Sequence, residues 1–301
     1  MPNTETGSKT PSDTDLNTTN LINQFVDTFL PQLIIAGNYA RQLQGRLQSR
    51  PEAKSGDAWT SVLTDADLGV QRYLEAYTLA QVPDWYFYGE EHAQSDNTKY
   101  FDPAARIAIM LDPINGTRLY KDGADSYDIL LSLRIDDRIV ATISHMPAQQ
   151  ITYIADCYDG CRRIDHTGAA ATSSSAINVG PSNNANMTLA TYQTDALAAL
   201  LPASVDNVNM LTDYAADDPR CCLNSIFEGQ LGGYLFCDCA LLDVGATAFA
   251  VTCAGGVATK PDGNPLDVFA HFDPERREDL LVCMNPKLHD VVSKAIRRGA
   301  D

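Results

Sequence analysis

Apolar positions recur with helical spacing in some segments and with strand-like spacing in others. A period close to 3.6 residues predicts a helix over residues 21–47, with Pro31 expected to kink or split it. The polar residues of Thr64–Asp67 are typical of a second helix start. A continuous apolar run over 107–111 predicts a strand covered on both faces. Further strands are predicted over 85–88, 126–133, 138–145 and 150–155.

The second half of the chain mixes the same two patterns. Strands are predicted over 187–192 and 233–237, and helices over 196–201 and from Asp243 to Cys253. Gly255-Gly256 is expected to end the last of these helices. Strands that alternate with helices indicate a layered α/β or α+β fold.

A composition change divides the chain. Residues 171–186 are rich in Ser, Asn, Gly and Ala, which is typical of a connecting loop. We therefore expect an N-terminal α+β subdomain over 20–170 and a C-terminal α/β subdomain over 171–301. The polar residues 1–19 are expected to form a disordered lead-in.

Composition and charge limit the partners. The chain has 301 residues, of which 45% are hydrophobic and 20% charged, as in an ordinary soluble globular protein. A net charge of −17 repels nucleic acid polymers and anionic membranes, so neither is expected as a partner. A small phosphorylated substrate remains compatible, because bound divalent cations reverse the local field. No apolar stretch is long enough to span a membrane and no signal-peptide pattern begins the chain, so a cytoplasmic location is expected.

The eight cysteines have spacings that match no zinc framework. We expect buried, reduced thiols, with a redox role for Cys157 and Cys161 as the alternative.

The turn Asp112–Thr117 carries groups suited to ion binding. The Asp112 carboxylate, the Ile114 carbonyl and the Asn115 amide oxygen are hard ligands of the kind that Mg²⁺ prefers. The N–H groups of Gly116 and Thr117, at the start of a helix, would face an anion. The same residues are also compatible with a plain loop.

Further carboxylates follow strands or begin helices, where the sites of α/β proteins assemble. They are Asp67, Glu90, Glu91 and Asp243. Each one alone is more typical of a helix cap or a solvated surface group than of a functional site.

Taken in order, these segments resemble the motifs of the inositol monophosphatase superfamily. The matching segments are Ile35-Ala36-Gly37, Thr64–Asp67, Gly89-Glu90-Glu91, Asp112–Thr117, Leu242–Ala246, Ala254-Gly255-Gly256 and Pro261–Asp267. The resemblance implies an αβαβα layered sandwich of the sugar phosphatase fold and a homodimer. It also implies a Mg²⁺-dependent phosphomonoesterase that acts on a sugar phosphate, an inositol phosphate or a 3'-phosphonucleotide.

The resemblance assigns a role to each site residue. Most metal ligands would come from the N-terminal subdomain, whereas the C-terminal subdomain would supply Asp243 and the segment that recognises the substrate. Two or three Mg²⁺ ions, or Mn²⁺ in their place, would be bound. The implied ligands are Glu90, Asp112, the Ile114 carbonyl, Asn115 and Asp243, with Glu91 at a third ion.

The remaining roles concern the water and the phosphate. Asp67 would accept a hydrogen bond from the Thr117 hydroxyl, so that Thr117 orients and helps deprotonate the attacking water. Gly116 and Thr117 would hold the phosphate through their N–H groups, with Arg118 as an additional contact. The implied reaction is metal-assisted phosphoryl transfer to water.

Two departures from the family pattern bear on activity. Asn115 stands where the family has Asp, so a negative charge is missing beside the metal ions. Phe236 stands where inositol-cleaving members carry a Glu, which disfavours inositol phosphate. The alternative is therefore an impaired or inactive member, natural or engineered at Asn115, that acts as a binding or regulatory protein.

Overall fold

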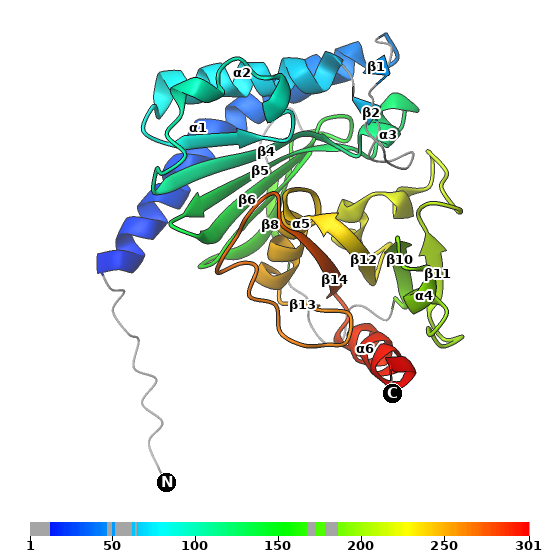
Figure 1. The fold of residues 1–301 in the computed structure, drawn as a ribbon. Helices are drawn as coiled ribbons and strands as arrows, with labels where there is room; N and C mark the ends of the chain where they lie inside the picture. The colour runs from blue at the N-terminus through cyan, green and yellow to red at the C-terminus, as the bar shows by residue number, and fades with distance from the viewer. Residues whose placement is uncertain are drawn as a thin grey trace.

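The computed structural model describes residues 13–46, 50–51, 62–63, 65–167, 173–177 and 186–300. Helices and sheets alternate in layers (Figure 1). Helices α1 (Asp13–Leu43) and α2 (Asp65–Gln81) cover a seven-stranded sheet. Helix α5 (Leu241–Cys253) lies between this sheet and a five-stranded sheet, and α6 (Pro286–Ala300) packs on the latter. The predicted αβαβα layering is confirmed.

The seven-stranded sheet is antiparallel except for its first pair of strands, which is parallel. Its strands neighbour one another in sequence order. They are β3 (Tyr86–Gly89), β4 (Ile107–Asn115), β5 (Asp128–Ile135), β6 (Arg138–Met146), β7 (Ile151–Asp156), β8 (Gly160–Asp165) and β9 (Ser173–Ile177).

The five-stranded sheet has the order β11-β10-β12-β14-β13. Its strands are β10 (Thr188–Tyr192), β11 (Asp206–Asn209), β12 (Gly233–Ala240), β13 (Val257–Thr259) and β14 (Arg277–Cys283). The short elements are β1 (Arg50–Pro51), β2 (Val62–Leu63), α3 (Thr117–Lys121), α4 (Asp195–Ala198) and the 3₁₀ turns η1 (His92–Gln94), η2 (Thr98–Tyr100), η3 (Pro219–Cys221) and η4 (Leu223–Ile226).

Helix α1 corrects two expectations. It begins at Asp13, so residues 13–19 are helical rather than part of a disordered lead-in, while residues 1–12 lie outside the described part. It also continues through Pro31, so the proline does not split it, and it ends at Leu43. Phe25, Phe29 and Leu33 recur on one face and are fully buried, so packing holds the helix on both sides of the proline.

Strand β9 corrects the predicted limit of the first sheet. Ser173–Ile177 pairs antiparallel with β8, so this sheet extends beyond residue 170. The strand is polar and exposed because it forms the sheet edge, and such a composition is indistinguishable from that of a loop.

Candidate active site

The turn after β4 has the geometry that its sequence predicts. Pairing between β4 and β5 shifts between Asp112 and Asn115, since Pro113 has no N–H to offer the ladder. The Ile114 N–H donates to Asp112 Oδ1 at 3.1 Å. Gly116 adopts a left-handed conformation with φ of 86°, which glycine tolerates best, and α3 starts at the next residue.

Four other carboxylates surround Asp112, which is only 3% exposed. Burial raises the pKa of the Asp112 carboxyl well above its usual value, and these neighbours raise it further by repulsion. They belong to Glu90, Asp243, Asp128 and Asp67. The structure therefore brings together acids from α2, the end of β3, β4, β5 and α5, as predicted for all except Asp128.

Asp128 is the site residue that sequence reasoning missed. It is 1% exposed and accepts a hydrogen bond from Asn115 Nδ2 at 3.0 Å and one from Ser144 Oγ at 2.6 Å. Burial raises the pKa of Asp128 to about 6, although these hydrogen bonds oppose the shift. The available signal was an acid inside the apolar run from Tyr127 to Leu131.

Thr117 lies between two acceptors. Its Oγ1 donates to the Ile114 carbonyl at 2.9 Å and lies 3.4 Å from Asp67 Oδ1. One hydroxyl has one proton, so the shorter contact is the stronger bond. Asp67 and Thr117 therefore lie close together as predicted, but the Ile114 carbonyl competes with the Asp67 carboxylate for the hydroxyl proton of Thr117.

Three predicted site residues, Asp67, Glu91 and Arg118, do not line the pocket that the predicted metal ligands line. Glu91 is 3% exposed, and its N–H donates to Gln71 Oε1 at 2.9 Å. The Arg118 guanidinium stacks on Tyr214, 3.6 Å from the ring centroid, and its Nε lies 4.0 Å from Asp122 Oδ2.

The pocket has a volume of about 460 Å³ and receives residues from both sheets. Its acidic and polar lining includes Glu90, Asp112, Asn115, Thr117, Asp128 and Asp243, and also Glu275 and Arg277. Its apolar lining, the apolar wall, includes Tyr192, Met210, Cys222, Leu223, Phe236 and Leu242. The Phe236 ring packs 5.6 Å from that of Tyr192, between ring centroids.

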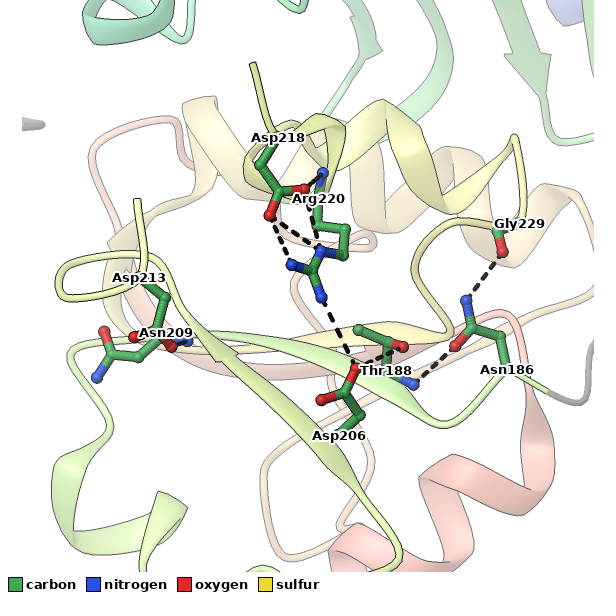
Figure 2. A network of polar contacts seen from close by, with 8 residues as sticks. All are labelled: Asn186, Thr188, Asp206, Asn209, Asp213, Asp218, Arg220 and Gly229. Carbon is green, nitrogen blue, oxygen red and sulfur yellow. Dashed lines mark hydrogen bonds and ion pairs between the residues drawn. The ribbon is translucent and has the colours of Figure 1, made fainter. Parts of the chain in front are cut away.

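A polar network anchors the segment that contributes part of the apolar wall. Figure 2 shows Arg220, from η3, beside Asp218 and directed toward Asp206 at the start of β11. Its guanidinium pairs with Asp218 at 2.7 Å and with Asp206 at 3.8 Å. The neighbouring Cys221 and Cys222 line the pocket.

The donor set suits a hard cation. Carboxylates, a carbonyl and an amide oxygen are the ligands that Mg²⁺ takes, and a divalent cation would relieve the repulsion around Asp112. Among the described residues, no three or more His, Cys, Asp or Glu side chains are placed so that they could hold a metal ion. The Ile114 carbonyl and the Asn115 amide are ligands of other kinds. The fit to Mg²⁺ therefore rests on the chemistry and charge of the donors and not on their spacing.

The cysteines and helices add two observations. All eight cysteines are free. Cys161, Cys221, Cys222, Cys239 and Cys283 are buried as predicted, whereas Cys237 and Cys253 are partly buried and Cys157 is exposed. In the described part of the chain no helix has the length and apolar character needed to span a membrane.

The stacked helices and sheets, with an acid-lined pocket shared by both sheets, define a layered αβαβα protein. The sequence matches the inositol monophosphatase family over residues 27–298, and the chain belongs to that family. Family membership supports a phosphatase, which is a hydrolase. No curated protein sequence matches the chain.

Solved structures share the fold at low sequence identity. The Thermotoga maritima IMPase is 18% identical with a TM-score of 0.68, and the match covers 91% of this chain and 99% of that one. The extragenic suppressor protein suhB from Bartonella henselae is 16% identical with a TM-score of 0.68, covering 92% and 99%. An IMPase/NADP phosphatase complexed with Mg²⁺ and phosphate is 14% identical with a TM-score of 0.67, covering 92% and 95%.

Proposed function

We propose that the protein is a Mg²⁺-dependent phosphomonoesterase acting on a small phosphorylated metabolite. The observation that carries the proposal is the buried Asp112 carboxyl, with the carboxylates of Glu90 and Asp243 acting on it from two other elements. A buried group of like charges is costly unless a cation compensates for it.

The metal-holding residues would be Glu90, Asp112, the Ile114 carbonyl, Asn115 and Asp243. Bound Mg²⁺ would lower the pKa of water and neutralise the charge on the leaving oxygen. The neighbour solved with Mg²⁺ and phosphate supports this choice of ion. A third ion at Glu91 is less favoured, because that side chain does not line the pocket.

The protein's own groups would orient the reactants. Thr117 Oγ1, near Asp67, would accept the proton of the attacking water while passing its own toward the Asp67 carboxylate. The N–H groups of Gly116 and Thr117 would hold the phosphate at the start of α3. Arg118 would reach the phosphate only after leaving the Tyr214 ring.

The apolar wall narrows the substrate class. Phe236 and Tyr192 offer flat, apolar surfaces rather than acceptors for the hydroxyl groups of a polyol. A nucleoside with a 3'-phosphate has a base that can pack on such a wall, so 3'-phosphonucleotides are favoured over sugar and inositol phosphates.

The test is phosphate release from a panel of nucleoside 3'-phosphates, sugar phosphates and inositol 1-phosphate, with Mg²⁺ or with a chelator. We expect Mg²⁺-dependent release, fastest from the nucleotides, and a fall in kcat of about 100-fold or more in Thr117→Ala. The matched control is Thr252→Ala, a threonine on α5 outside the pocket. Absence of both phosphate release and Mg²⁺ binding refutes the proposal.

Asn115 favours a second candidate, a binding or regulatory protein that does not turn over its ligand. Calorimetry with a nucleoside 3'-phosphate and Mg²⁺ separates the two. Binding without phosphate release supports the second candidate, whereas Mg²⁺-dependent turnover excludes it.

A further inference from the structure

Asn115 and Asp128 are direct cross-strand partners. The register of β4 and β5 pairs them beyond the irregularity at residues 113–114. Asn115 Nδ2 lies 3.0 Å from Asp128 Oδ1. Both residues line the pocket beside Asp112. The neutral residue at position 115 therefore has a buried carboxylate against it.

This contact fixes which way the Asn115 amide faces. A carboxylate only accepts hydrogen bonds, so the amide nitrogen must face Asp128. In a planar amide the oxygen then points to the other side. An unrestrained asparagine at a cation site could present its nitrogen instead, which would repel the ion.

We propose that Asp128 is a positioning residue for the metal site, turning the Asn115 oxygen toward the metal and supplying the negative charge absent from position 115. The inference rests on the proposed function. Together the hydrogen-bonded pair carries one negative charge, as a single aspartate at position 115 would.

The environment of Asp128 supports this role. Ser144 Oγ donates to its second oxygen, Oδ2, at 2.6 Å, and Asn224 Nδ2 donates to Ser144 Oγ at 2.9 Å. The carboxylate is thereby held with Oδ1 directed at Asn115. Its charge also reaches the proposed ligand set, since it acts on Asp112.

The contact with Asp128 disfavours an acidic residue at position 115. An aspartate there would place a second carboxylate oxygen about 3 Å from the buried Asp128 carboxylate, which is strongly unfavourable without a cation. Restoring the family residue alone should therefore damage the metal-free protein. Exchanging the two residues should be tolerated.

The experiment compares the unmodified protein with Asp128→Asn, Asn115→Asp and the exchange variant Asn115→Asp/Asp128→Asn. Mg²⁺ affinity is measured by calorimetry, and the urea midpoint is measured with a chelator at pH 8. We expect Asp128→Asn to weaken Mg²⁺ binding about tenfold or more. Asn115→Asp should lower the metal-free urea midpoint, and the exchange variant should recover both quantities.

Asp156→Asn is the matched control, because it removes another buried carboxylate of the same sheet that does not line the pocket. Its Mg²⁺ affinity should equal that of the unmodified protein. A merely structural role of Asp128 would not let the exchange variant regain Mg²⁺ affinity.

The outcomes distinguish the two proposals. Failure of the unmodified protein to bind Mg²⁺ refutes the proposed function. Equal Mg²⁺ affinity of the unmodified protein and Asp128→Asn overturns only the present inference. An Asn115→Asp variant as stable as the unmodified protein without metal, or an exchange variant without recovered affinity, also overturns it.

Discussion

Replacing Gly89 with alanine tests how firmly α2 holds the segment that carries Glu90. A Cβ at this position would lie 2.3 Å from Gln71 Oε1 and 2.4 Å from Gln71 Cδ, so Gln71 must move. Gln71 is 1% exposed and bonded at both ends of its amide. Its Oε1 accepts from the Glu91 N–H and its Nε2 donates to Glu75 Oε1, both at 2.9 Å.

The two hydrogen bonds set the size of the effect. A buried N–H left without a partner costs about 1–3 kcal/mol, and a lost donor to a carboxylate costs about 1.5–3 kcal/mol. Local relaxation recovers part of this, so we expect Gly89→Ala to lower the free energy of unfolding by about 3 kcal/mol. Mg²⁺ affinity should fall as well, because Glu90 follows directly.

Urea denaturation followed by tryptophan fluorescence measures the loss, and a double-mutant cycle identifies its cause. Gln71→Ala removes the clashing atoms, so Gly89→Ala on that background should cost less than about 1 kcal/mol. Equal costs of Gly89→Ala in the two backgrounds, or a cost below about 0.5 kcal/mol in the unmodified protein, would refute the reasoning.

Two further expectations concern buried groups remote from the metal ligands. Burial lowers the pKa of His145 to about 3, so the folded state holds a neutral ring while the unfolded state takes up a proton below its pKa of about 6.5. Stability should therefore fall by about 1.4 kcal/mol between pH 7.5 and 5.5 from this group, a loss smaller in His145→Gln by urea denaturation. The Tyr127 hydroxyl is buried without a hydrogen-bond partner in the described residues, so Tyr127→Phe should stabilise the protein by about 1 kcal/mol. A lower melting temperature of that variant would contradict this expectation.

Local signals explain which parts of the fold the sequence predicts. The apolar run of β4, the proline that follows and Gly116 each act through nearby backbone, so the strand and its turn are found together. Strand β9 was not predicted from the sequence. Its polar residues are extended because they pair with β8, and amino-acid composition gives no information about that pairing. Strand β14 and helix α6 were likewise not predicted.

The candidate site also has features that the sequence predicts and features that it does not. Residue types and their order are sequence properties, so Glu90, Asp112 and Asp243 could be predicted as one group, and the structure brings them together. The direction of the Arg118 side chain depends on Tyr214, and the Glu91 backbone N–H depends on Gln71, both of which come from other elements. The contact of Asp128 with Asn115 depends on strand register, which is set by the whole sheet. The features of the site that the sequence did not predict are therefore those that depend on contacts between residues far apart in the chain.

Helix α5 has a consequence for how the molecule comes apart. Ten of its thirteen residues are buried, and it contacts strands β4 to β8 on one side and β12 to β14 on the other. The core on one face of each sheet loses α5 side chains when this helix is withdrawn, so we expect unfolding of the two halves to be coupled. Asp243 lies in the first turn of the same helix. Local opening of either half therefore displaces Asp243 from the pocket. The loss of ligand binding at the pocket would then report how cooperatively the two halves unfold.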